Sequence, residues 1–443
     1  MSSLQAKTPV SRVAPWKGHL AALLVAAPVF VGLLVFGADD DVLAAMLALG
    51  QIAAALLVLL LTVRETPARL WRASLGPAIL IAAALGWAIL GMSRPDRLAP
   101  DAAALALLKL VGLFATALSA ALAGQSRRML HRMALWLGVL AVAYTMFSLW
   151  SGQVHPYTVW GEPKGAHAYR FTGTLMNANA AGCVFGMVGL VCLGLMHYLL
   201  KRTDLRESGL GHYALLALVS CGAIAAMGAC VLTSSRTSLI ATIAIALVVI
   251  LIEARRSNDR FVLIVASIVL VGGVLMAGGQ VVSRWDTLTA DAGLRLAGYE
   301  HYASGVGAEP WFGAGLGGFH AWHEAHLTSA VAPAMWAYGA VHGALLQTML
   351  EGGAPYGLLL SAAVLVATGQ VVALLLKRGR SDVVANALLG AVLLAIICAS
   401  VDIALNVPAV AALVCALFGA AWGSVLGQGS RGLGPALSEH RDA

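Results

Sequence analysis

The chain has 443 residues, of which 60% are hydrophobic and only 11% are charged. Soluble domains carry about 25% charged residues, so this composition excludes a soluble globular protein. The formal net charge of +7 does not indicate nucleic-acid binding, because the basic residues recur in alternate loops instead of gathering on one face. We therefore expect an all-α polytopic membrane protein.

Twelve apolar runs follow one another along the chain, each long enough to approach or span the membrane. A helix needs about 20 apolar residues to cross the hydrocarbon core. The expected transmembrane helices cover 18–36, 42–62, 75–92, 102–124, 133–151, 178–200, 213–232, 238–253, 261–279, 354–376, 383–404 and 408–427. The gap between the seventh and eighth runs, 233–237, is short.

The loops between these runs differ in charge in a regular way. Every second loop is basic, and basic loops face the cytoplasm. The pattern therefore places both termini in the cytoplasm and an even number of crossings between them. The cytoplasmic clusters are Lys7, Arg12 and Lys17; Arg64, Arg69 and Arg72; Arg127, Arg128 and Arg132; Lys201, Arg202 and Arg206; Arg255, Arg256 and Arg260; Lys377, Arg378 and Arg380; and Arg431 and Arg441.

The outward side carries the two long loops, at about 152–177 and 280–353. Long loops tend to be functional, and the second has the composition of short helices followed by a glycine-rich turn, "EPWFGAGLGGF". We expect three parts: residues 1–279 with nine transmembrane helices, a periplasmic loop over 280–353, and residues 354–443 with three helices and a cytoplasmic tail.

Few cations lie on the outward side, so each is a candidate for binding an anion. Arg236 lies in "LTSSRTS" between two apolar runs, where it is either an anion ligand in a wet cavity or an arginine reaching the interface. Arg170 precedes the sixth run, and Asn177 lies at that run's start. Together they predict either a phosphate site at a helix N-terminus or ordinary capping by Asn177.

The second outward loop and the helix after it add two candidates. Arg295 lies in "DAGLRLAGYEHY", where it is either an anion ligand or the partner of Asp291 or Glu300 on one helix face. His342 opens the helix that returns to the membrane, and a neutral imidazole there could accept a proton. The alternative is a structural histidine.

Other ionisable residues receive no role at this stage. His320, His323 and His326 recur every third residue and do not have the arrangement of a helical zinc motif. Neither a metal nor a cofactor is expected. Lys109 and Asp402 lie within or beside transmembrane runs, where a structural role is as reasonable as a functional one.

Five motifs, in order, resemble the O-antigen ligase and polymerase superfamily of bacterial envelope glycosyltransferases. They are "RFTGTLMNANAAG", "LTSSRTSLI", Arg295 in the outward loop, "EPWFGAGLGGF" and "VHGALLQTMLEGGAPYGLL", and they span about 170–360. The chain departs from the family at Gly343, where the family often has Asn after the histidine.

The resemblance implies an enzyme of the bacterial inner membrane with a periplasmic active site. It would transfer an O-antigen glycan from undecaprenyl diphosphate to a sugar hydroxyl of lipid A–core, with inversion and without a metal. Arg236 and Arg295 would hold the diphosphate, assisted by Arg170 and Asn177. His342 would activate the acceptor hydroxyl. A moderate size and a single large late loop favour the ligase branch.

Three alternatives remain at this point. An O-antigen polymerase would use the same donor with a lipid-linked acceptor, and a protein O-glycosyl ligase would use a protein acceptor. A transporter of lipid-linked glycans would need ionisable residues along a path through the membrane. Among the basic residues only Lys109 is clearly within a run, which favours an enzyme at the outward face.

Overall fold

The computed structural model describes residues 14–95, 98–203, 208–257, 288–329, 331–336, 338–378 and 382–427. Over this part the protein is almost entirely helical. The long helices are α1 (Pro15–Leu34), α2 (Asp41–Thr62), α3 (Ala68–Met92), α4 (Pro100–Gly124), α5 (Arg127–Val154), α6 (Ala178–Leu200), α7 (Leu210–Leu232), α8 (Arg236–Ser257), α10 (Leu288–Ala308), α13 (Ala344–Arg378), α14 (Val383–Val401) and α15 (Pro408–Gly427). Shorter elements are α11 (Phe319–His326), α12 (Ala332–Met335), β1 (Thr158–Val159), β2 (Glu162–Pro163) and the 3-10 turns Phe36–Ala38, Val63–Glu65, Gly165–His167 and Ala404–Asn406.

Eleven of the described helices are long and apolar enough to cross a membrane. This confirms the all-α polytopic class expected from composition. The expected span at 261–279 lies outside the described residues. The short break between the seventh and eighth runs is real: α7 ends at Leu232, α8 begins at Arg236, and Ser234 between them has a left-handed φ of 54°.

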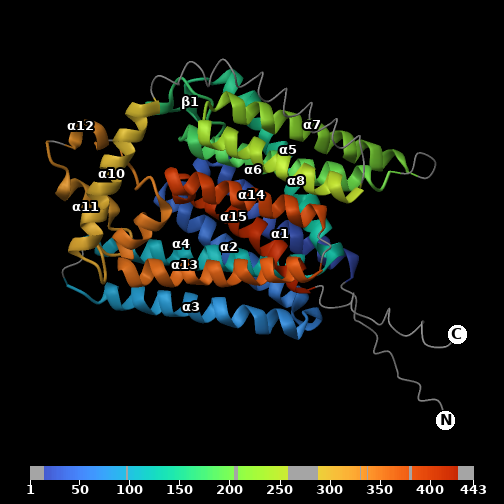
Figure 1. Ribbon diagram of the computed structural model, residues 1–443, viewed down its shortest axis with the longest axis horizontal. Coiled ribbons are helices and arrows are strands. Elements are labelled where there is room, and N and C mark those ends of the chain that lie inside the picture. Colours follow the sequence, from blue (N-terminus) through green and yellow to red (C-terminus); the bar gives the residue numbers. More distant parts are fainter. Residues whose placement is uncertain are drawn as a thin grey trace, which may run out of the picture.

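The centre of the bundle is formed by α6, α14 and α15, whereas α3 and α13 lie at its edge (Figure 1). Small residues let the central helices approach closely. A Cβ added at Gly182 would meet Ser235 and Thr233, and one at Gly186 would meet Thr242, so α6 packs directly against the start of α8. The absence of a side chain at Gly182 and Gly186 thus permits this close packing.

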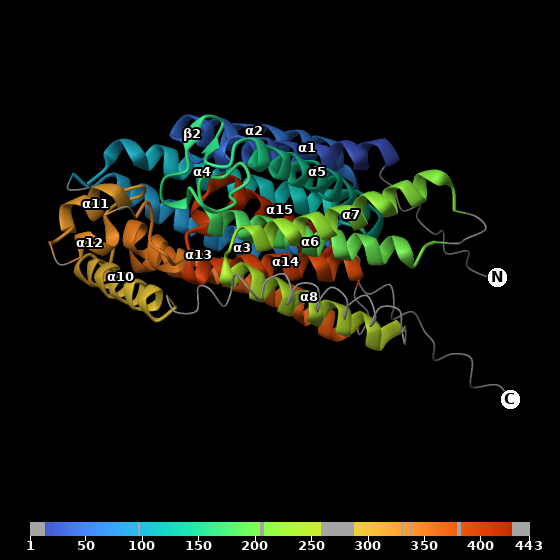
Figure 2. The same cartoon turned by 90° about the horizontal axis from the view of Figure 1, so that it is seen from above.

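The helices α10, α11 and α12 form a cap at one end of the bundle, the same end as the β1–β2 hairpin (Figures 1 and 2). A small apolar cluster that includes Tyr302, Phe319, Trp322 and Leu350 joins this cap to α13. The cap therefore packs against the helix that directly follows His342.

The predicted glycine-rich turn lies between α10 and α11 and docks onto a bend in α13. Gly353 bends that helix with a φ of 79°, a conformation that favours glycine. Two backbone hydrogen bonds join the parts, from Ala314 N–H to the Leu350 carbonyl (2.8 Å) and from Ala354 N–H to the Pro310 carbonyl (2.8 Å). The helix thus begins at Ala344, ten residues before the expected span, and bends where that span was expected to start.

Candidate active site

A cavity of about 250 Å³ lies where the outer ends of α6, α8, α14 and the cap meet. It is lined mostly by polar side chains, and it brings together residues that are far apart in the sequence. Its lining includes Arg170, Asn179, Ser234, Ser235, Arg236, Thr237, Ser238, Leu294, Arg295, Tyr338, His342, Cys398 and Asp402. Four of the five predicted site residues are in this set: Arg170, Arg236, Arg295 and His342.

The end of α8 that faces the cavity is built from small polar residues. Ser234 to Ser238 all line the cavity, so the N-terminus of α8 is directed at it. The hydroxyls of Ser235 and Ser238 are 2.9 Å apart, and that of Ser238 is 3.5 Å from the Cys398 sulfur on α14. Exposed N–H groups at a helix start attract anions, and Arg236, the first residue of α8, adds a full positive charge.

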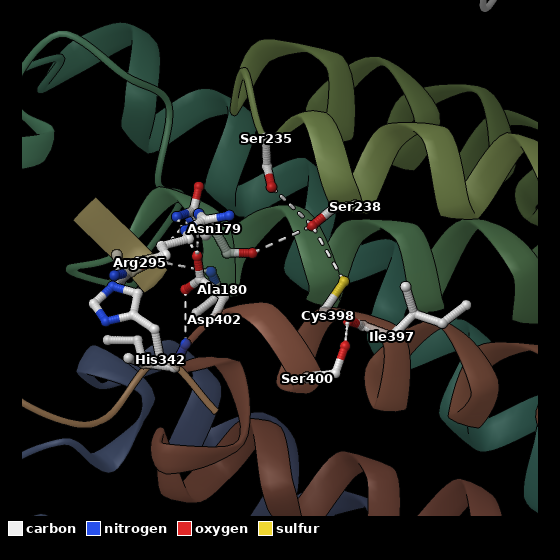
Figure 3. Close-up of polar contacts among 12 residues, drawn as sticks. Asn179, Ala180, Ser235, Ser238, Arg295, His342, Ile397, Cys398, Ser400 and Asp402 are labelled. Carbon is white, nitrogen blue, oxygen red and sulfur yellow. Dashed lines mark hydrogen bonds and ion pairs between the residues drawn. The ribbon is translucent and has the colours of Figure 1, made fainter. Parts of the chain in front are cut away.

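Polar contacts link Asn179, Asp402 and Arg295 along the cavity wall (Figure 3), and Arg170 joins them through Asn179. Arg170 donates to the Thr233 carbonyl (2.9 Å) and to Asn179 Oδ1 (2.6 Å). Asn179 in turn donates to Asp402 Oδ2 (2.6 Å), which also lies 3.4 Å from Arg295. These bonds fix the guanidinium of Arg170 and bring Arg295 to the same wall.

Most of the charged side chains that line the cavity are basic. Among the described lining residues there are three guanidinium groups and one carboxylate, that of Asp402. Arg295 approaches this carboxylate at 3.4 Å, beyond the 2.7–2.9 Å of a strong charge-assisted hydrogen bond. Side chains of this kind suit an anionic ligand.

His342 lies just before α13, in an irregular segment beside the cavity. Its ring is 4.3 Å from the ring of Tyr338, and its Nδ1 is buried with no hydrogen-bond partner among the described residues. Burial lowers the pKa of His342; the Asp402 carboxylate raises it and the Arg295 charge lowers it, and the net direction is down. A neutral imidazole is therefore favoured at neutral pH, as a proton acceptor requires.

Asn177 has a different position from the other four candidates. It does not line the cavity; its Oδ1 accepts hydrogen bonds from the N–H groups of Asn179 (2.8 Å) and Ala180 (3.0 Å). This is the capping geometry of a helix N-terminus. The geometry supports the capping interpretation of Asn177, while the amide that lines the cavity belongs to Asn179.

The three histidines of the outward loop have separate surroundings. His323 is buried between the hydroxyl of Tyr302 (3.1 Å) and the carbonyl of Met335 (3.1 Å), whereas His326 stacks on Trp322 and His320 is exposed. His323 thus holds the cap together. Lys109 lies near a different group, Asp39: burial raises the pKa of Asp39, and the charges of Lys109 and His320 partly offset this.

Asn179 and Asp402 are the cavity residues whose part was not predicted. Asn179 is two residues from the predicted Asn177, and the motif "MNAN" contains both amides without indicating which one faces inward. Asp402 gave a weak signal, a carboxylate at the outward end of an apolar run, where a charge is costly unless paired. The order of the partners along the chain does not reveal that pairing.

Three arginines and a buried imidazole at one cavity of a helical membrane protein can bind an anionic substrate. Comparison with known families points the same way: residues 221–362 match the family model described as O-antigen ligase. This part of the chain is thus similar to the O-antigen ligase family, which supports an enzyme of the glycosyltransferase type, ligase or polymerase. Comparison with curated proteins gave no match.

Proposed function

We propose that this protein transfers a finished O-antigen glycan from undecaprenyl diphosphate to a sugar hydroxyl of lipid A–core. The reaction takes place at the periplasmic face of the bacterial inner membrane, and both termini lie in the cytoplasm. The basic loops support this orientation. Asn179 near the start of α6 and Arg236 at the start of α8 line the cavity, whereas Lys201 and Arg202 follow the end of α6 and Arg255 lies near the end of α8.

The observation that carries the proposal is the convergence of Arg170, Arg236, Arg295 and His342 on one cavity. A lipid diphosphate is an anion at the membrane surface, and arginine forms two-pronged hydrogen bonds with phosphate oxygens. We assign Arg236 and Arg295 to the diphosphate. Arg170 is already held by Thr233 and Asn179, so it contributes charge and shape to the wall.

The proposed reaction is a single displacement. The acceptor oxygen forms a bond to the anomeric carbon as the bond from that carbon to the diphosphate oxygen breaks. The hydroxyl proton moves to the neutral imidazole of His342, and the electron pair leaves with the diphosphate, where the two arginines stabilise the charge that develops. Attack opposite the leaving group inverts the anomeric configuration.

The test is transfer of labelled glycan by the full-length protein in liposomes with purified donor and acceptor. Arg236→Ala, Arg295→Ala and His342→Ala should each raise the barrier by about 2–4 kcal/mol, or roughly 30- to 1,000-fold in rate. His320→Ala is the matched control because that side chain is exposed in the same cap. His323→Ala is unsuitable because His323 is buried in the cap. Full transfer by all three variants would refute the assignment.

Gene deletion separates the ligase from the related activities. Loss of a ligase leaves lipid A–core without any attached glycan, whereas loss of a polymerase leaves single repeat units attached. Loss of a protein O-glycosyl ligase would leave lipid A–core fully decorated with glycan. The liposome assay also excludes a carrier, because a carrier moves the labelled lipid without making a new covalent product.

A further inference from the structure

Glu351 is a carboxylate within the helix that follows His342, and both of its oxygens have defined partners. Its Oε2 accepts a hydrogen bond from the Gly317 N–H (3.2 Å), and its Oε1 accepts one from Gln347 Nε2 (2.6 Å). A charged group in a transmembrane helix is costly and usually marks function. Glu351 does not line the cavity, so any effect on the reaction must pass through other groups.

Gln347 continues this chain of contacts toward the cavity. Its Oε1 accepts a hydrogen bond from the N–H of Val341 (2.7 Å), the residue just before His342. The amide of Gln347 is thus used at both ends, as donor to Glu351 and as acceptor from the backbone. With Glu351 as acceptor, Gln347 has only one orientation that satisfies both contacts.

The backbone of His342 is held from the other side as well. The hydroxyl of Tyr299 on α10 lies 2.8 Å from the His342 carbonyl and 3.3 Å from the Ser400 carbonyl on α14. The irregular segment that carries the imidazole is therefore held by hydrogen bonds before and after the Cα of His342, while its Nδ1 has no hydrogen-bond partner in the part of the chain that the structure describes.

We propose that Glu351 and Gln347 are positioning residues that set the backbone of Val341 and His342, and through it the place of the imidazole in the cavity. The inference rests on the proposed function, because it concerns the base of that reaction. Glu351 acts at a distance of nine residues, through the amide of Gln347. The bend at Gly353 and the docked glycine turn bring Gly317 to the carboxylate.

The donor-to-acceptor direction of these three hydrogen bonds allows a control within the same residues. In Glu351→Gln, the new amide N–H₂ faces another donor, either the Gln347 N–H₂ or the Gly317 N–H. In Gln347→Glu, a carboxylate faces the Glu351 carboxylate, so each single variant loses one hydrogen bond. The double variant restores all three: the new amide at 351 accepts from Gly317 and donates to the new carboxylate at 347, which accepts from Val341. All three variants keep the side-chain shapes nearly unchanged.

The experiment measures kcat and KM for glycan transfer in liposomes. Each single variant should lower kcat about 10- to 100-fold, since a displacement of about 1 Å in a reacting group has effects of that size. KM for the donor should stay within about twofold, because Arg236 and Arg295 are unchanged. The double variant should recover most of the lost kcat. Glu324→Gln, on the exposed surface of α11, is the matched control.

Two results overturn the inference: single variants with kcat within about twofold of the parent, or a double variant no better than the worse single variant. Thermal unfolding of each variant shows whether a low kcat reflects loss of folded protein. If the double variant recovers the stability of the parent but not its kcat, the result also contradicts positioning.

If the parent protein itself transfers no glycan, the proposed function fails. If the parent is active and the variants are unaffected, only this inference fails.

Discussion

An aspartate, an arginine and a histidine lie together at each end of α14, but the contacts among them differ between the two ends. Before its first residue, Asp382 Oδ2 accepts from Arg127 Nε (2.6 Å) and lies 2.9 Å from His131 Nε2. After its last residue, Asp402 lies 3.4 Å from Arg295, with His342 close by in the same cavity wall.

The difference lies in how completely the polar groups are paired. At the Asp382 end, the carboxylate has close contacts to both Arg127 and His131. At the Asp402 end, the ion pair is long, His342 Nδ1 has no hydrogen-bond partner among the described residues, and a cavity of about 250 Å³ adjoins it. Arg, Asp and His therefore satisfy one another at the Asp382 end, whereas at the Asp402 end the same residue types line the proposed binding site.

Of the substitutions that compare the two ends of α14, Asp402→Asn should have the largest effect, and this effect should be on activity. The variant removes the charge that faces Arg295, while its amide oxygen still accepts from Asn179. We expect transfer to slow about 10- to 100-fold, since a hydrogen bond to a charged group contributes about 1.5–3 kcal/mol. Steady-state kinetics in liposomes measures this, normalised to folded protein. A rate within about twofold of the parent would contradict the role of Asp402 in holding Arg295.

Asp382→Asn should instead reduce stability by about 1–2 kcal/mol at pH 7, with activity per folded molecule within about twofold. The figure lies below the range for buried charged pairs because Arg127 is 66% exposed and screened by solvent. Thermal unfolding in detergent measures it. A loss of activity without a loss of stability would remove the contrast between the two ends of α14.

The same variant has a pH signature. Burial raises the pKa of Asp382, but the hydrogen bonds and charges of His131 and Arg127 outweigh this, so the pKa is lowered from 3.8. A lowered carboxyl pKa stabilises the fold above the unfolded pKa, and this is lost as the pH falls through the folded pKa. The difference in Tm between parent and variant should therefore shrink below about pH 4.

The pH dependence of glycan transfer tests the role of His342 at the Asp402 end of α14. Because burial holds the pKa of His342 below its ordinary value of 6.5, the imidazole stays neutral to lower pH than a free histidine. The acid limb of kcat/KM should have its midpoint below pH 6.5. A midpoint above 6.5, or an acid limb that is unchanged in the residual activity of His342→Ala, would argue against this base.

Gly343→Asn should have the smallest effect. Gly343 has space for a side chain: an added Cβ would lie 3.5 Å from the Tyr299 ring and 3.8 Å from the Ser400 carbonyl, which are ordinary contacts. We expect kcat within about threefold of the parent, because the hydrogen bonds of Val341 and His342 do not involve this side chain. A larger fall in kcat would show that the glycine matters for the conformation of this segment.

The sequence by itself determined the class of protein, most of its spans and the candidate residues. The length of an apolar run and the charge of a loop are local properties, because each segment partitions into lipid or water according to its own residues. Arg170, Arg236, Arg295 and His342 could be selected because few charged groups lie on the outward side.

Only the tertiary structure decided which of these residues meet and what holds them. Asn179 faces the cavity while Asn177 caps its helix, and Asp402 pairs with residues more than 100 positions away in the chain. Hydrogen bonds connect Glu351 to Gln347 and Gln347 to the backbone of Val341, next to His342, where α13 bends and the glycine turn docks on it. Such contacts depend on how helices far apart in the sequence pack together, and the spacing of residues along the chain does not predict this packing.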